Sequence, residues 1–428
     1  MRTVLVTGPG GAGRTTVAAA TALAAARRGR RTLLLTADGI PGFPEDTEPT
    51  EVTDGLWSAR IDSGEHFRGE LLALQDQASA VLDLLGGNRL DGEELTELPG
   101  SAELALLHTL RRAARGDWSR AGHDLLVVDL PPLREALALL ALPEQLRRYL
   151  RRLLPPERQA ARALRPMLAQ LAGVPMPAQW LYEAAARRDA QLAAVQALIE
   201  DRDTTLRLVA EPGPAAEDAL RTARTGLALH GLRVDALAVN RVLPRHSADP
   251  WFAELAAQQE KTVDHWYEEW APGTALCQVP HLGRDPRGLD DLARLGTAAD
   301  GAAGDAGLAG GLDGRGPGRA DDPWWIESPD TPDGLDGLLP GARIVTTGPP
   351  AGDGDPVLVW CLPLPGAAKK DLQLVRRGDE LLLTVGPFHR IVPLESGLRR
   401  CTVSGAALTD GVLRVRFTPD PGLWPRTG

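Results

Sequence analysis

Short apolar runs alternate with longer helix-like segments along the first 296 residues. Each run is nearly continuous in apolar residues, which is typical of strands in a parallel sheet with helices on both faces. The candidate strands are Thr3–Thr7, Thr32–Thr36, Leu125–Asp129, Leu206–Ala210 and Ala236–Asn240. The alternation of strand and helix therefore predicts an α/β fold over residues 1–296, with a doubly wound sheet.

Between the third and fourth predicted strands the pattern is helical only. Breaks at Pro155-Pro156 and Gly173-Val174-Pro175 divide it, and we interpret about 133–200 as a helical subdomain beside the sheet. One amphipathic segment within it has an apolar stripe and a basic side, formed by Leu146, Tyr149, Leu150, Leu153 and Leu154 and by Arg147, Arg148, Arg151 and Arg152. This pattern fits a groove wall, a membrane-facing helix or an ordinary core-facing helix, and the last is the commonest.

After residue 296 the composition changes twice. Residues 297–341 are rich in Gly, Asp, Ala and Pro and bury too little apolar surface to offset the entropy of ordering, so we predict a flexible linker. In residues 342–423 apolar and polar residues alternate between turn signals, which predicts a small all-β sandwich. The predicted strands are Val357–Leu364, Leu372–Arg376, Glu380–Val385, His389–Leu394, Cys401–Ser404 and Val412–Phe417.

Composition narrows the class of protein. A net charge of −10 argues against a general nucleic-acid binder. No apolar run approaches the ~20 residues of a membrane-spanning helix, and no signal peptide pattern precedes the first strand, so we expect a cytoplasmic protein. Only Lys261, Lys369 and Lys370 are lysines among 47 basic residues, so an arginine at a usual lysine position carries less information in this chain.

A glycine-rich loop follows the first predicted strand and precedes an alanine-rich helix predicted over Thr15–Arg28. It matches the phosphate-loop pattern G-x-x-x-x-G-K-[ST] except that Arg14 replaces the lysine. Backbone N–H groups of such a loop converge on phosphate oxygens, the helix N-terminus adds positive charge, and the Thr15 hydroxyl is placed to bind Mg²⁺. The strand–loop–helix context favours this interpretation over a plain glycine-rich turn. The predicted phosphate-binding residues are Gly8, Gly10, Gly11, Ala12, Gly13, Arg14, Thr15 and Thr16.

Two aspartates lie at or just beyond the ends of predicted parallel strands. Asp38 follows the second strand and Asp129 ends the third, at the carboxyl edge where such sheets bind ligands. An aspartate there can also cap a helix or form a turn, but the spacing favours a role in the site.

These residues together resemble a known family. With Asp38 in LLLTADG, Asp129 in LLVVDLPP and Asn240 in LAVNRVLP, residues 1–296 resemble the ArsA/tail-anchored-protein-targeting ATPases, which are relatives of MinD and ParA proteins with a deviant Walker A motif. The segments LTELPGSAEL, LALPEQLRRYL and VPHLGRDPRGLDDL extend the resemblance. It implies ATP and Mg²⁺ as cofactors, a homodimer, and an apolar or tail-anchored protein client.

The resemblance implies roles for matched positions. Asp38 would position the attacking water, and Arg14 would act beside it at the Walker lysine position. Thr15 and Asp129 would hold Mg²⁺. Asn240 would read adenine, and Arg241 and Pro280 are further predicted cofactor-binding residues.

The chain departs from the family pattern at both lysines and both switches. Arg14 keeps a positive charge in a wider, planar group, whereas Pro9 replaces the signature lysine with neither charge nor backbone N–H. The first switch continues Asp38-Gly39-Ile40-Pro41 instead of D-P-A-H, and the second runs Asp129-Leu130-Pro131-Pro132 instead of D-T-A-P. We therefore predict nucleotide binding with slow hydrolysis.

The C-terminal sandwich resembles the α-crystallin, or small heat-shock, domain. The matching segments include LPG at 364–366, KDL at 370–372 and DGVL at 410–413. Only Gly386-Pro387-Phe388 separates two predicted strands, which is too short for the exchange strand of bacterial small heat-shock proteins, and no I-x-I tail follows. We expect a monomeric binding module.

Two functional hypotheses stay open. One is a nucleotide-gated homodimeric ATPase that handles an apolar or membrane-protein client, with peripheral membrane contact and no nucleic acid. The alternative is a catalytically dead nucleotide-binding scaffold or holdase chaperone. The helical subdomain contains only Met167 and Met176, although client grooves of the family are often methionine-rich, and the family's metal-site cysteines are absent. A third hypothesis, a ParA/MinD-like positioning ATPase, explains neither the insertion nor the sandwich.

Overall fold

The chain forms two compact units. The computed structural model describes residues 1–77, 88–116, 118, 122–154, 178–245, 247–270, 274–302, 325–327 and 358–423. The first unit comprises Met1–Pro212 and Val234–Gly316, and the second comprises Gly213–Arg233 and Pro317–Gly428.

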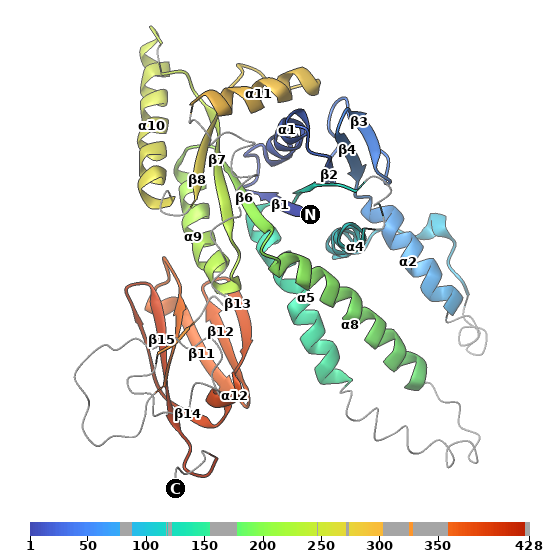
Figure 1. Ribbon diagram of the computed structural model, residues 1–428, viewed down its shortest axis with the longest axis vertical. Helices are drawn as coiled ribbons and strands as arrows, with labels where there is room; N and C mark the ends of the chain where they lie inside the picture. The colour runs from blue at the N-terminus through green and yellow to red at the C-terminus, as the bar shows by residue number, and fades with distance from the viewer. Residues whose placement is uncertain are drawn as a thin grey trace. The chain divides into compact units, whose positions relative to one another are not determined.

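An eight-stranded sheet with the order β3-β4-β2-β5-β1-β6-β7-β8 organises the first unit (Figure 1). Its strands are β1 Arg2–Thr7, β2 Thr32–Thr36, β3 Thr50–Thr53, β4 Leu56–Arg60, β5 Leu125–Asp129, β6 Thr204–Ala210, β7 Val234–Val242 and β8 Ala275–Pro280. All neighbouring pairs are parallel except β3 and β4. The predicted doubly wound α/β fold is therefore confirmed, and the five predicted strands form the centre of the sheet.

The alanines of α1 (Arg14–Arg27) explain how this helix packs on the sheet. Nine of its residues are buried, six of them alanines, and they join a core with β1, β2 and β5. Small side chains allow close approach, and α11 (Gly288–Ala302) packs against α1 so tightly that a Cβ at Gly296 would lie 3.3 Å from Ala24. α1 is thus packed closely against both the sheet and α11.

Helices α5 (Leu133–Leu153) and α8 (Ala178–Glu200) form the described part of the predicted helical subdomain, and α2 (Ser63–Gln77) and α4 (Ser101–Arg115), which precede it in the chain, pack with them; the four helices are called the helical subdomain below. α5 and α8 pack against each other, and α4 contacts both α2 and α8. The predicted breaks at 155–156 and 173–175 lie outside the described residues. Of the predicted apolar stripe, Leu146 and Leu150 line a cavity, while Tyr149 and Leu153 are exposed.

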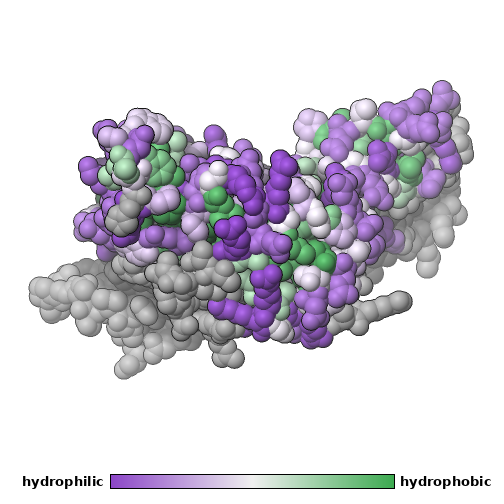
Figure 2. All heavy atoms as spheres, turned by 90° about the horizontal axis from the view of Figure 1, so that it is seen from above, coloured by the Kyte–Doolittle hydropathy of each residue, from purple (hydrophilic) through white to green (hydrophobic). Residues whose placement is uncertain are grey.

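Other apolar side chains also reach the surface. Leu104 on α4 and Trp251 on α10 (Pro250–Trp270) are 49% and 72% exposed. Figure 2 shows hydrophobic residues in separate groups among hydrophilic ones on the face drawn. None of the described helices combines the length and hydropathy needed to cross a membrane.

The second unit contains the predicted sandwich. Its sheets have the orders β14-β15-β10-β9 and β11-β12-β13. The strands are β9 Trp325–Glu327, β10 Leu358–Pro363, β11 Leu372–Arg377, β12 Glu380–Val385, β13 Phe388–Pro393, β14 Cys401–Thr409 and β15 Val412–Pro419, with the short helix α12 at Ser396–Arg399. The six predicted strands are confirmed. β9 lies within the segment predicted as a linker and pairs with β10, and α11 extends into that segment as far as Ala302.

Helix α9 (Pro214–His230) lies between β6 and β7 in the chain but belongs to the second unit. It contacts β10 and β13. The Thr225 hydroxyl donates to the carbonyl of Pro365 at 2.7 Å, and the Arg390 guanidinium donates to the carbonyl of Leu229 at 2.7 Å. The sandwich is therefore completed by a helix that ends more than a hundred residues before β10.

Acid is expected to destabilise the second unit through His230. Burial, together with Arg390 and His389, lowers the pKa of His230 to about 3. The unfolded chain takes up this proton near pH 6.5 while the folded unit stays neutral, so stability falls as pH drops below 6.5, by up to ~1.4 kcal/mol per pH unit. Urea unfolding followed by hydrogen exchange in β10–β13 at pH 7 and 5 measures this slope. His230→Gln should reduce the dependence of the unfolding free energy on pH, and the surface control His265→Gln should not. Equal slopes in the unaltered protein and both variants would contradict the prediction.

Candidate functional site

The glycine-rich loop between β1 and α1 has a shape that only glycine permits at several positions. Gly11 and Gly13 adopt φ angles of 78° and 85°, a region that other residues rarely occupy. A Cβ at Gly8 would lie 1.9 Å from the Val209 carbonyl oxygen, and one at Gly13 would lie 2.4 Å from the Asn240 amide nitrogen. Both backbone conformation and close packing therefore explain the glycine pattern.

Asn240 supports this loop from β7. Its buried side-chain amide donates to the carbonyl of Ala12 at 2.7 Å. This hydrogen bond stabilises the loop, and the sequence did not predict it. Arg241, with a φ of 56°, pairs with Glu211 at 2.8 Å. Pro280 ends β8, beside the end of β7. The three predicted cofactor-binding positions thus lie on neighbouring strands, and their role toward the nucleotide stays a prediction.

Thr15 brings the two predicted aspartates together. Its hydroxyl lies 2.7 Å from Oδ2 of Asp129 and 3.3 Å from Oδ2 of Asp38. The Thr36 hydroxyl donates to Oδ2 of Asp129 at 3.1 Å and accepts from the backbone N–H of Asp38 at 3.1 Å. Thr36 was missed in the sequence, where the only signal was its position at the end of a strand, two residues before Asp38.

The second carboxylate oxygen of Asp129 has an unusual environment. Oδ1 is buried and has no hydrogen-bond partner among the described residues. Burial raises the pKa of Asp129 to about 6, against the opposing effects of Thr15, Arg14 and Thr36. A buried carboxylate oxygen without a partner is costly, and a bound cation at Oδ1 would remove that cost. The donor set of a hydroxyl and a carboxylate suits a hard cation such as Mg²⁺.

The loop is bonded to the segment after β5. The Arg14 guanidinium donates to the carbonyl of Leu130. The Thr7 hydroxyl donates to the carbonyl of Pro131 at 2.8 Å, and the N–H of Leu133 donates to the carbonyl of Gly8 at 2.9 Å. Arg14 therefore contacts the backbone of the second switch through its planar guanidinium. A lysine would present a compact ammonium group at this position instead.

Strand, glycine-rich loop and helix, with a threonine and two aspartates at the carboxyl edge of a parallel sheet, define a P-loop nucleotide-binding protein. Residues 1–299 match the family model of the ArsA ATPases, described as anion-transporting ATPases, and residues 355–417 match the HSP20-like domain found in ArsA. The chain belongs to the ArsA ATPase family. The resemblance found in the sequence is thereby confirmed for both parts of the chain.

Three relatives align with this chain along almost their whole length. The chain is 55% identical to "Uncharacterized protein SCO2128" of Streptomyces coelicolor, over 100% of both chains. It is 29% identical to "Protein Rv2184c" of Mycobacterium tuberculosis, over 99% of this chain and 97% of that one. It is 24% identical to "Putative arsenical pump-driving ATPase 1" of Aquifex aeolicus, over 93% of this chain and 95% of that one. The alignments with these relatives therefore cover both domains of this chain.

Proposed function

We propose that the chain binds ATP with Mg²⁺ in the loop at Gly8–Thr16 and hydrolyses it slowly. The observation that carries the proposal is the Thr15 hydroxyl 2.7 Å from Asp129, whose other oxygen is buried without a partner among the described residues. Thr15 and Asp129 would hold Mg²⁺, which when bound neutralises charge on the phosphates. The loop N–H groups bind phosphate oxygens, and Asp38 orients the attacking water.

Slow hydrolysis follows from the two replaced lysines. A contact that acts mainly on charge developing in the transition state changes kcat more than affinity. Pro9 offers neither a cation nor an N–H for this purpose, whereas Arg14 still places a positive charge beside the loop. Nucleotide binding is therefore retained while turnover is reduced.

The helical subdomain supports a role in handling an apolar client. A cavity of about 430 Å³ lies between α2, α4, α5 and α8. Its apolar lining consists of Phe67, Leu71, Leu74, Leu104, Leu107, Leu146, Leu150, Leu192 and Val195. We propose a nucleotide-gated homodimer in which this cavity receives apolar side chains of a client protein. The altered switch segments after Asp38 and Asp129 favour a second candidate, a nucleotide-binding scaffold or holdase without turnover.

Replacing Thr15 by Val is expected to abolish most of the Mg²⁺ dependence of nucleotide binding. The variant removes one proposed metal ligand and leaves Asp129 with one hydrogen-bond donor fewer, and losses of this kind typically weaken metal affinity by ~10–100-fold. Binding of a fluorescent ATP analogue, measured in Mg²⁺ and in EDTA, gives the effect directly. Thr262→Val, on α10, is the matched control. The proposed magnesium site is rejected if the ratio of the affinities in Mg²⁺ and in EDTA is the same in Thr15→Val as in the unaltered protein.

A further inference from the structure

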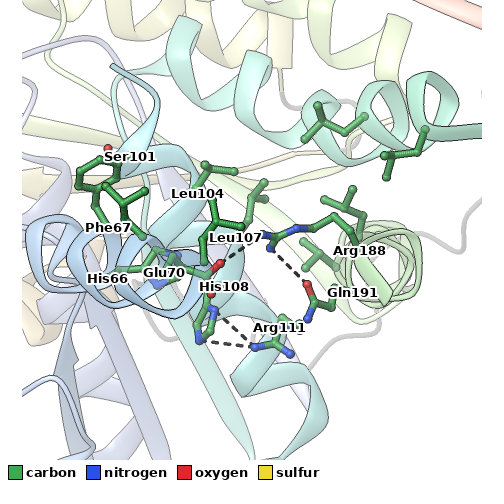
Figure 3. A pocket seen from close by; sticks show the side chains of 16 residues that line it. His66, Phe67, Glu70, Ser101, Leu104, Leu107, His108, Arg111, Arg188 and Gln191 are labelled. Atoms are coloured by element: carbon green, nitrogen blue, oxygen red, sulfur yellow. Dashed lines mark hydrogen bonds and ion pairs between the residues drawn. The ribbon is translucent and has the colours of Figure 1, made fainter. Parts of the chain in front are cut away.

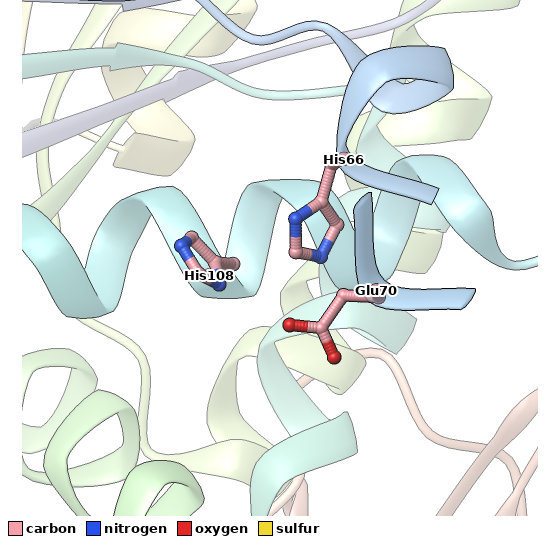
Figure 4. A group of neighbouring side chains, drawn as sticks. All are labelled: His66, Glu70 and His108. Carbon is pink, nitrogen blue, oxygen red and sulfur yellow. The ribbon is translucent and has the colours of Figure 1, made fainter. Parts of the chain in front are cut away.

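Three side chains from two helices converge at the wall of the cavity in the helical subdomain. His66 and Glu70 lie on α2 and His108 on α4, and one ligand atom from each lies within 4.8 Å of the other two (Figure 4). His66 and Glu70 are four residues apart, which places them on the same helix face. The ring centroids of His66 and His108 are 4.5 Å apart. The packing of α2 on α4 thus assembles two imidazoles and a carboxylate.

His66 and His108 are both partly buried. Imidazole nitrogen is a common ligand of divalent transition-metal ions. Glu70 is exposed, and its negatively charged carboxylate offers an oxygen ligand to a cation.

Two arginines contact the cluster, one at Glu70 and one at His108. Arg188 donates to Oε2 of Glu70 at 3.2 Å and to Gln191 at 3.2 Å (Figure 3). The Arg188 side chain is 54% exposed, so solvent screens its positive charge. Arg111 lies 3.4 Å from one ring nitrogen of His108 and 3.5 Å from the other. Hydrogen-bonded carboxylates are common partners around metal ligands, so Arg188 is a positioning residue here.

We propose that His66, Glu70 and His108 bind one divalent transition-metal ion, with Zn²⁺ as the best match. Two histidines and one carboxylate form a set that holds Zn²⁺ with a fourth position open to water. Hard cations such as Mg²⁺ prefer oxygen ligands alone, so this site differs in chemistry from the Thr15–Asp129 pair. The bound ion joins α2 to α4 and fixes one wall of the cavity.

Titration of the metal-free, full-length protein with Zn²⁺ against a chromophoric chelator tests the proposal. The experiment omits nucleotide so that phosphates do not compete. We expect one Zn²⁺ per chain, with affinity reduced at least tenfold in His108→Ala and in Glu70→Gln. His265→Ala, an exposed histidine on α10, serves as the control and should bind as the unaltered protein does. Co²⁺ should give a visible absorption band of four- or five-coordinate geometry that disappears in the double variant His66→Ala, His108→Ala.

Thermal melting distinguishes a variant that fails to fold from one that has lost metal binding. Zn²⁺ should raise Tm of the unaltered protein, as any ligand of the folded state does, and should leave Tm of the double variant unchanged. Glu70→Gln conserves size and polarity, so it keeps the test valid if an alanine variant fails to fold. Equal Zn²⁺ affinity in the unaltered protein and in Glu70→Gln, or no stoichiometric binding at all, would overturn the proposal.

Discussion

Replacing both Pro9 and Arg14 by lysine is expected to raise ATP turnover by ~10²-fold or more above Arg14→Lys alone, with similar nucleotide affinity in the two variants. Lysine at position 9 restores a cation and a backbone N–H that act on charge developing during phosphoryl transfer. Lysine at position 14 removes the guanidinium that donates to the carbonyl of Leu130 and replaces it by a compact ammonium group. The first change addresses the transition state, whereas the second mainly alters the loop.

Phosphate release at saturating ATP gives kcat for each variant, and titration with a fluorescent nucleotide gives Kd. Arg28→Lys, just after the C-terminal end of α1, is a matched control for an arginine-to-lysine change. If Arg14→Lys alone equals the double variant, position 9 does not limit the reaction. If neither variant gains activity, the altered switches have disabled the site and the scaffold function is favoured.

Substitution of Asp235 by Ala is expected to destabilise the first unit by ~3–5 kcal/mol, because it removes the carboxylate that pairs with two buried arginines. Oδ2 of Asp235 lies 3.4 Å from Arg2 and 3.0 Å from Arg207, and the three side chains are 4%, 8% and 0% exposed. The cluster connects the starts of β1 and β7 to the middle of β6. Desolvation lowers the pKa of Arg2, and Asp235 opposes this effect.

Urea unfolding followed by hydrogen exchange in β1, β6 and β7 measures this loss. Asp264→Ala, on the exposed side of α10, is the matched control and should change the free energy of unfolding by less than ~0.5 kcal/mol. A loss below ~1 kcal/mol for Asp235→Ala would mean that water or a rearranged partner solvates the two arginines.

The central sheet was predictable because its strands are buried on both faces and are therefore continuously apolar. β3, β4 and β8 were not predicted. β3 and β8 lie at the two edges of the sheet and β4 lies next to β3, and polar residues such as Glu51, Arg60 and Gln278 interrupt the apolar pattern there. β9 was missed because its three residues lie in a segment rich in glycine and aspartate, and pairing with β10 gives it strand structure. Edge strands depend on partners that a local pattern does not reveal.

The candidate site was predictable where a motif fixes the spacing. The glycine loop, Thr15 and the two aspartates follow from strand ends that must meet at one sheet edge. The Asn240 contact with Ala12 was not predictable, since it depends on the close packing of β7 against Gly13. The cluster of His66, Glu70 and His108 was missed for a similar reason, because α2 and α4 bring together residues that are more than thirty positions apart.

The position of α9 in the chain has a consequence for synthesis on the ribosome. This helix is translated between β6 and β7, yet its contacts at Thr225 and Leu229 are made with residues of the sandwich that appear far later. At ~5–20 residues per second the delay is on the order of ten seconds. During that interval the nascent helix has one uncovered face. A chain that terminates early, before β10, retains this uncovered face, so translation errors in the C-terminal module expose a surface that chaperones and proteases can recognise.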